Sequence, residues 1–333
     1  MPINPTTYRT SLVKWYGLLA IFVGGLTALQ SRVNGRLSIH LQNGVLAGFI
    51  SNLSGWIILT TLVALFPSNR ASFKTTLTSI RRSDIKFWEI LGGFGGSFFL
   101  AVQGSGVPVI GIALFTIAIV AGQTSTSLLV DKLGISPGGK KPITRIRLVT
   151  ACFTLMGVAV AVIPKLSQGS FDIFYIILAL IVGVIVSFQQ AINGRLNVLT
   201  KKPIVTAWFN FATGTSLLIV FLAIKSVFGG KVGTFPTNPL LYTGGALGLT
   251  FIAISAYTIS ELGVLNFIMF SVAGQLFTAL LIDSIAPVHG STLSGFVIFG
   301  TFITFISISI PRILDWIKQQ PQIIRGGQSH PHS

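Results

Sequence analysis

The sequence predicts an all-α, polytopic membrane protein with ten transmembrane helices arranged as two inverted five-helix repeats. Three observations lead to this fold class. Only 9% of the 333 residues are charged and 51% are apolar, whereas ordinary soluble domains carry about 25% charged residues. Apolar stretches close to the roughly 20 residues that a helix needs to cross a bilayer recur along the whole chain. Finally, blocks of the second half repeat blocks of the first.

The apolar stretches predict helices, because only helices and closed barrels satisfy their backbone groups in lipid and barrel strands alternate in polarity over about ten residues. Arg9 and Lys14 precede the first stretch as they would in a signal peptide, but no small-residue cleavage site follows, so we expect a retained helix. The ten expected spans lie near 15–33, 45–66, 87–104, 108–130, 148–164, 172–192, 204–228, 240–260, 262–282 and 293–310.

The distribution of positive charge predicts the orientation. All but five of the 23 lysines and arginines belong to the N-terminus, the C-terminus or the loops after spans 2, 4, 6 and 8. Because cytoplasmic loops are enriched in Lys and Arg, we expect both termini in the cytoplasm and these basic loops against anionic lipid head groups. Aromatic residues lie in the spans instead of alternating with the charges, so no nucleic-acid partner is expected. The five exceptions are Arg32, Arg36, Lys165, Lys225 and Lys231.

An internal repeat divides the chain into two halves. Residues 29–37 read LQSRVNGRL and residues 188–196 read FQQAINGRL, a shift of 159 positions. A second block matches at a shift of 152: Gly92, Gly93 and Gly96 answer Gly244, Gly245 and Gly248, and Ala121-Gly122-Gln123 answers Ala273-Gly274-Gln275. Because five spans per half is an odd number, the second half must enter the membrane in the opposite sense. We expect repeats over 1–164 and 165–311 and a polar cytoplasmic tail over 312–333.

Inverted repeats are the recurring plan of secondary transporters, with the substrate near the midplane between them. This chain, whose halves each open with a glycine-containing helix that ends Gln-x-x-x-Asn-Gly-Arg-Leu, resembles the drug/metabolite transporter superfamily and, within it, the YdcZ-like inner-membrane exporters. The resemblance covers nearly the whole chain. It implies export or exchange of a small molecule across a prokaryotic inner membrane. The smallest members of the superfamily carry a carboxylate in the first helix, where this chain has Gln30 or Gln189, so a glutamate-centred proton antiport is not expected.

Amide side chains are the candidate substrate ligands. Gln30 and Asn34 are four residues apart and share one helix face, as do Gln189 and Asn193. Amides within a membrane helix are expected to face the bundle interior. The alternative for the glutamines is interhelical hydrogen bonding. The expected substrate-binding residues are Gln30, Asn34, Gln189, Gln190 and Asn193, supported by Gln123 and Gln275.

The Asn-Gly-Arg segments have two interpretations. Asn-Gly is typical of a helix C-terminus, where one of the two takes the left-handed conformation, and Arg36 and Arg195 would then favour the negative helix end. Alternatively, the arginines close a gate or attract an anionic group, since Arg36 falls on the sparsely charged side. The spacings Gly92-xxx-Gly96 and Gly244-xxx-Gly248 favour helix packing faces.

None of the seven acidic residues lies near the centre of a predicted span. If a carboxylate couples transport to an ion, the candidates are Glu261, then Asp131 and Asp283. The alternative for all three is a helix-end charge among lipid head groups.

These patterns favour a secondary transporter, in the sense of an exporter, of a small polar or amphipathic metabolite or drug-like molecule by alternating access. The alternatives are a non-transporting membrane scaffold or accessory subunit and, less favoured, an intramembrane enzyme. An enzyme acting on a pyrophosphate would need clustered acids around a metal, and the sequence has neither metal-ligand spacing nor a Walker loop. We therefore expect no catalytic residue, metal or cofactor.

Overall fold

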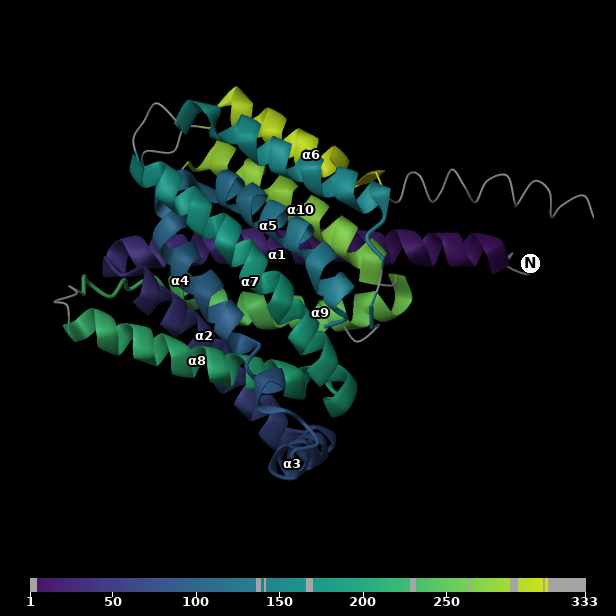
Figure 1. Ribbon diagram of the computed structural model, residues 1–333. Helices are drawn as coiled ribbons and strands as arrows, with labels where there is room; N and C mark the ends of the chain where they lie inside the picture. Colours follow the sequence, from purple (N-terminus) through teal and green to yellow (C-terminus); the bar gives the residue numbers. More distant parts are fainter. Residues whose placement is uncertain are drawn as a thin grey trace, which may run out of the picture.

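The computed structural model describes residues 5–135, 139–140, 142–165, 170–227, 232–262, 264–287, 293–307 and 309–310. All the regular structure in this part of the chain is helical (Figure 1). The elements are α1 (Pro5–Leu41), α2 (Gly44–Leu65), α3 (Pro67–Arg81), η1 (Phe87–Ile90), α4 (Gly93–Ile110), α5 (Ile112–Leu133), α6 (Arg145–Val162), η2 (Ile163–Lys165), α7 (Ser170–Thr200), α8 (Pro203–Val227), η3 (Pro239–Tyr242), α9 (Gly244–Leu262), α10 (Val264–Ile285) and a final apolar helix over Gly295–Ser307.

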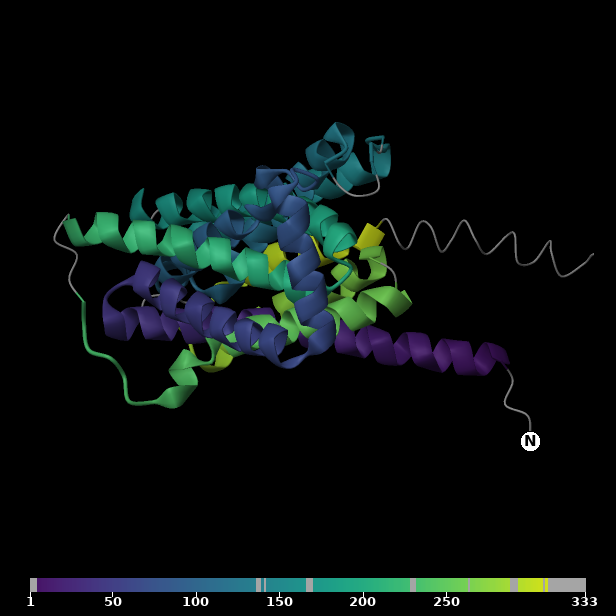
Figure 2. The same ribbon diagram turned by 90° about the horizontal axis from the view of Figure 1, so that it is seen from below.

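Seven of these helices are long and apolar enough to cross a membrane, which confirms a polytopic helical membrane protein. They are α1, α2, α4 together with η1, α5, α6, α7 and α8. Three shorter apolar helices, over Gly244–Ser255, Phe270–Ile285 and Gly295–Ser307, stand where the last three spans are predicted. Figures 1 and 2 show that α1 begins, and the helix over Gly295–Ser307 ends, at the same end of the bundle.

Two pairs of helices make the most extensive contacts, α1 with α10 and α5 with α7. Both pairs meet at glycines. A Cβ atom added at Gly24 or Gly274 would collide with a backbone carbonyl of the partner helix, and so would one added at Gly122 or Gly183. Gly24 matches Gly183 in the repeat, and Gly274 matches Gly122. The same close contact therefore recurs with the two halves exchanged, and α1 and α7 run in opposite directions (Figure 1).

A second set of helix pairs shows the same exchange. Gly55 of α2 meets Gly245 of α9, and Gly214 of α8 meets Gly93 of α4, in each case closely enough that a Cβ would touch the facing backbone. The 3₁₀ helices η1 and η3 also cover matched positions, and each precedes the glycine-rich start of α4 or α9. Helices of different halves are thus packed backbone to backbone, as small residues allow in membrane bundles.

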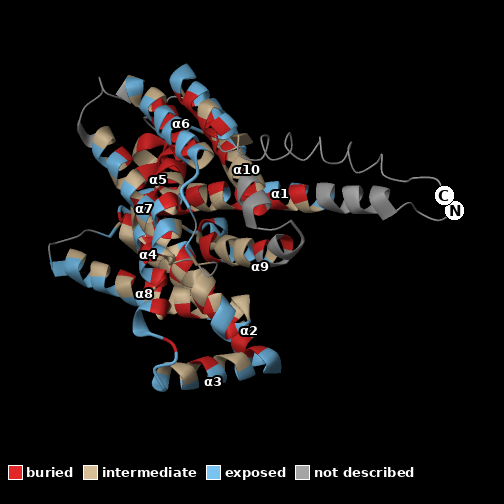
Figure 3. Ribbon diagram, turned by 45° about the vertical axis from the view of Figure 1, so that its right-hand side comes forward, coloured by how far each residue is buried: buried red, intermediate tan, exposed pale blue. Residues whose placement is uncertain are grey.

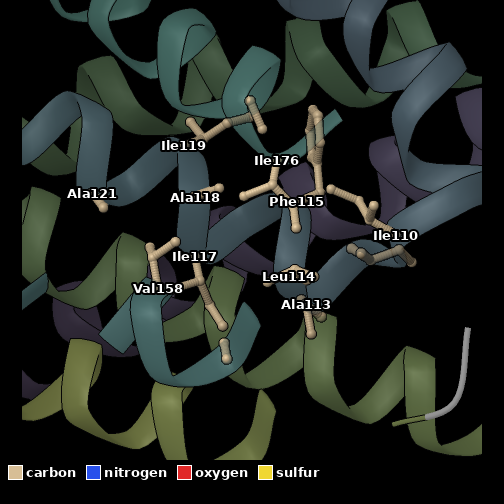
Figure 4. Close-up of a cluster of buried hydrophobic side chains, with 14 of the residues drawn as sticks. Ile110, Ala113, Leu114, Phe115, Ile117, Ala118, Ile119, Ala121, Val158 and Ile176 are labelled. Atoms are coloured by element: carbon tan, nitrogen blue, oxygen red, sulfur yellow. The ribbon is translucent and has the colours of Figure 1, made fainter. Parts of the chain in front are cut away.

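Helix α5 lies at the centre of the largest apolar cluster. A helix that is hydrophobic all round is expected to be buried, and the first ten residues of α5, from Ile112 to Ala121, are all buried. Figure 4 shows these side chains meeting Ile176 of α7 and Val158 of α6. Buried residues elsewhere concentrate on the inward faces of the surrounding helices, whose other faces carry exposed apolar side chains suited to lipid (Figure 3).

Helix α3 is amphipathic and follows α2 at one end of the bundle. Its apolar residues Phe73, Leu77 and Ile80 pack against a cluster that includes Leu196 and Phe209. Its basic residues are exposed. No counterpart of α3 occurs between α8 and η3 in the described part of the chain, which accounts for the change of shift between the two repeat blocks.

The ends of α1 and α7 correct one interpretation of the sequence. Asn34-Gly35 and Asn193-Gly194 do not end their helices, because α1 continues to Leu41 and α7 to Thr200. The left-handed residues that follow these helices are Gln42, with φ 50°, and Lys201, with φ 52°. These two residues are themselves matched in the repeat. Gly35 instead allows close approach, since a Cβ there would lie 3.0 Å from the side chain of Val107 in α4.

Candidate functional site

The amides of α1 pack on the glycine-rich start of α9. Gln30 Nε2 donates a hydrogen bond to the carbonyl of Gly244 at 2.9 Å. A Cβ added at Gly248 would lie 2.8 Å from the same nitrogen, and one added at Gly244 would collide with Asn34 Oδ1. The glycines of α9 therefore leave the space that the amides of the other half occupy.

The amides of α7 make the matching contact with α4. A Cβ added at Gly96 would lie 3.0 Å from Gln189 Nε2, and one added at Gly92 would collide with Asn193 Oδ1. Gln189 Nε2 also donates to Asn210 Oδ1 of α8 at 3.3 Å, near the upper limit for a hydrogen bond. Two amide clusters of the same construction thus stand between the halves, one on each amide-bearing helix.

The cluster on α1 is the more deeply buried of the two. Asn34 is fully buried and its Nδ2 donates to Gln103 Oε1 at 2.7 Å, and Gln103 Nε2 donates to Ser31 Oγ at 2.8 Å. Asn34 Oδ1 and Ser51 Oγ are buried without a hydrogen-bond partner among the described residues, and both lie against Gly244. A buried acceptor left without a donor costs about 1–3 kcal/mol, so these two oxygens are the polar atoms of the cluster whose hydrogen bonds are unmade in this conformation.

Helix α4 connects the two clusters. Its Gly96 contacts the amide of Gln189, and its Gln103 bonds Asn34. Seven residues separate these positions, which corresponds to about 10 Å along the helix at 1.5 Å per residue. A displacement of α4 relative to α1 or α7 must therefore change one amide cluster or both.

The supporting amides differ from these four. Gln190 is exposed, and Gln123 and Gln275 are half-buried beside the glycines that join α5 to α7 and α1 to α10. None of these three side chains forms a hydrogen bond with another described residue, so the structure does not bring them into the two clusters.

Arg195 is held by an acid and an aromatic ring. Its Nε lies 3.1 Å from Glu89 Oε1, and its guanidinium carbon lies 5.3 Å from the centre of the Trp88 ring. Glu89 is only 5% exposed, and its other oxygen accepts the backbone N–H of Lys86 at 3.0 Å. The carboxyl end of α7 is thereby tied to η1.

Arg36 occupies the matching position on α1 in a different setting. It is exposed and lines a pocket of about 370 Å³ at the carboxyl end of α1. The described residues that line this pocket include no carboxylate. The lining residues are Arg36, His40, Pro236, Thr237, Asn238 and Leu241.

The three candidate coupling carboxylates have different surroundings in the structure. Asp283 is 5% exposed and its Oδ2 accepts the backbone N–H of Ala113 at 2.7 Å, so it caps the start of α5 and is not a charge among lipid head groups. Asp131 pairs with Arg147 at 2.6 Å. Glu261 lies in α9, and its side chain is outside the described residues. Within the described ranges, no three His, Cys, Asp or Glu residues are grouped as a metal site requires.

Sequence reasoning missed Gln103 and Glu89. Gln103 stands near the end of the predicted third span, and its match in the second half is Ser255, so the repeat did not single it out. Glu89 stands at the very start of the same predicted span, next to a basic loop, and its match is Leu241. In both cases the partner lies far away in the chain, and only the fold brings the two together.

The apolar helices and the paired glycine contacts define a polytopic helical membrane protein. The family described as "Putative inner membrane exporter, YdcZ" matches the chain twice, over residues 15–160 and again over 174–310. The chain belongs to this family. The family description confirms the expected class, a membrane exporter of the inner membrane, and the double match confirms a chain of two related halves.

Comparison with solved structures shows the fold alone. A structure described only as "Crystal structure of protein" is similar over 91% of this chain and 97% of its own, with a TM-score of 0.57 and 16% sequence identity. No curated protein matches the sequence.

Proposed function

We propose that the protein is a secondary transporter that exports a small polar or amphipathic molecule by alternating access between two inverted five-helix halves. The observation that carries the proposal is the exchanged contact: α1 amides lie on α9 glycines, and α7 amides lie on α4 glycines. Two half-structures of opposite orientation can exchange their conformations, and the exchange opens a site between them to the other side. In this proposal all ten apolar helices cross the membrane, with both termini in the cytoplasm.

The difference between the two arginines supports the same proposal. The Arg195 end is closed by Glu89 and Trp88, whereas the Arg36 end holds a pocket. A transporter in one of its two access states has one end closed and the other open. In the opposite state we expect the Arg195–Glu89 ion pair to break.

The basic face of α3 supports contact with anionic lipids on the cytoplasmic side. Arg70, Lys74 and Arg81 of α3 and Arg82, which follows the helix, are all exposed. Juxtamembrane lysines and arginines of this kind gain about 1 kcal/mol each near an anionic surface.

Flux measurements test the function. Candidate substrates come from a metabolite library screened for thermal stabilisation of the purified protein, and each hit is then followed in proteoliposomes. We expect Gln30→Leu and Gln189→Leu each to reduce flux about tenfold, as the loss of one hydrogen bond worth about 1.4 kcal/mol predicts. The control is Thr61→Val, which removes an exposed hydroxyl that bonds only its own helix, to the carbonyl of Ile57.

The same variants separate the transporter from a scaffold, in which these amides only hold helices together. A scaffold predicts an equal loss of stability with and without substrate, and no flux in the native protein. Undiminished flux in both glutamine variants would remove the amide clusters from the transport pathway.

A further inference from the structure

The matched arginines Arg36 and Arg195 have different neighbours, and the difference comes from one residue of the 3₁₀ helix that faces each of them. On the second half, Arg195 meets the carboxylate of Glu89 in η1. On the first half, the segment facing Arg36 is η3, and the residue of η3 that matches Glu89 is Leu241. Leu241 is 7% exposed and packs against Leu37 of α1. The chain thus keeps the arginine in both halves and supplies its acid in only one.

A pocket lies where the acid is missing. Leu241 and Arg36 both line this pocket, an open depression of about 370 Å³ at the surface. No carboxylate among the described residues pairs with Arg36. The lining combines a guanidinium with the imidazole of His40, the amide of Asn238 and an apolar surface from Leu241 and Pro236. This is the composition of a site for an anionic group carried on an apolar body.

Arg36 belongs to a row of basic side chains on α1. Arg32, Arg36 and His40 follow one another at four-residue intervals and therefore share one face of the helix. The charge of Arg32 is repelled by that of Arg36 and attracted by that of Asp283. Arg32 therefore has an acidic neighbour of its own, whereas no carboxylate among the described residues pairs with Arg36. The Glu89 pair shows that a carboxylate is accommodated at the same place on α7, although the carboxyl end of a helix is negative.

We propose that the pocket at the carboxyl end of α1 binds the carboxylate of a small amphipathic anion, which Arg36 holds as Arg195 holds Glu89. Arginine presents a planar fork of donors that matches a carboxylate, and the apolar lining takes the body of the molecule. The inference rests on the proposed function in one respect, because it names the chemical class of the transported molecule.

Binding of benzoate to the purified full-length protein in maltoside detergent tests the proposal, with benzamide as the uncharged molecule of the same shape. Isothermal titration should show one benzoate site and at least tenfold weaker binding of benzamide. Arg36→Gln should weaken benzoate binding about tenfold, because it removes the charge of an exposed side chain without altering the apolar lining. Lys225→Gln, which removes a charge at the same end of the bundle but outside the pocket lining, should leave binding within about twofold of the native value.

The sharpest variant is Leu241→Glu, which gives η3 the acid that η1 has. We expect it to occupy Arg36 from within the chain and to abolish benzoate binding while the arginine is retained. Thermal unfolding of this variant shows whether it folds, and Arg36→Gln gives an independent answer if it does not. Equal binding of benzoate and benzamide, or native benzoate binding by either pocket variant, would overturn the proposal.

The anion could also be the phosphate of a lipid. Benzoate binding should persist when phosphatidylcholine nanodiscs replace detergent, and its disappearance there would show that Arg36 belongs to a lipid phosphate. The test is independent of transport. If benzoate binding depends on Arg36 but no flux is found, the pocket proposal holds and the proposed transport function is wrong. If flux depends on Gln30 but benzoate binding does not depend on Arg36, the transport function holds and the pocket proposal is wrong.

Discussion

At the scale of single residues, the fate of each polar side chain is decided by its partner on another helix. Asn34 and Asn193 stand in the same local sequence, Asn-Gly-Arg-Leu. Asn34 is fully buried with Gln103, whereas Asn193 is half-buried against Gly92. The second half carries Ser255 in the place of Gln103, and the extensive contact that α1 makes with α4 has no counterpart of similar extent between the described residues of α7 and α9. The two amide clusters are therefore similar in construction and unequal in burial.

The local sequence predicted that the amides turn inward, because an amide in lipid needs a partner. It could not predict that Asn-Gly would stay helical. The cap signal is a local preference, and the burial of Asn34 and the approach of Gly35 to Val107 outweigh it. The ion pair of Glu89 could not be predicted either, because nothing near Glu89 in the chain indicates that Arg195 will contact it.

Asp283 gives a prediction at this scale. Asp283→Ala should lower the free energy of unfolding by about 1 kcal/mol, because α5 loses the acceptor at its first turn. Asp283→Asn keeps an acceptor oxygen and should retain most of the stability. Thermal unfolding in detergent measures both. If the asparagine variant is as unstable as the alanine variant, capping is not what this side chain contributes.

If Asp283 instead couples transport to protons, the alanine and asparagine variants should differ in their flux as well as in their stability. Asp283→Asn would then be stable but would lose the pH dependence of flux. Retained pH-dependent flux in this variant would restrict Asp283 to its capping role.

At the scale of helices, glycine sets the distance between the halves. The positions of the helices could be predicted well from the apolar stretches, because the length needed to cross lipid is fixed by helix geometry. The pairing of helices could not, because α1 meets α10 and α5 meets α7 through contacts that only the folded chain brings together. Gly122 and Gly274, which the repeat matches in sequence, both lie at a close helix contact.

A glycine substitution tests this packing. Gly183→Ala should destabilise the protein by at least about 1–3 kcal/mol, because its Cβ would collide with the carbonyl oxygen of Ile119 and α5 and α7 would have to separate. Gly295→Ala, where a Cβ meets nothing within 4 Å, should change stability little. Thermal unfolding of the two variants side by side is the measurement. Equal stability would mean that α5 and α7 are not held at this contact.

At the scale of the whole molecule, the account depends on the two halves being oppositely inserted copies of one structure. In each half, the amides of the first helix contact glycines of the other half. This reciprocal arrangement is expected if the ancestor of the two halves packed against a second copy of itself. The proposed function also rests on a departure from symmetry: one arginine pairs with an acid, and its match lines a pocket. In the proposed orientation, which follows from the distribution of positive charge, the closed end faces the cytoplasm.

The most direct test of this insertion uses the two residues that follow α1 and α7. Gln42 and Lys201 are matched in the repeat, are both exposed, and have nearly the same backbone conformation, so a cysteine at either position meets equal local strain. The chain has a single cysteine, Cys152, which is replaced by serine beforehand. In intact cells a membrane-impermeant maleimide should label Gln42→Cys at once and Lys201→Cys only after the membrane is opened. Labelling of both from the same side would contradict the inverted arrangement and with it the proposed mechanism.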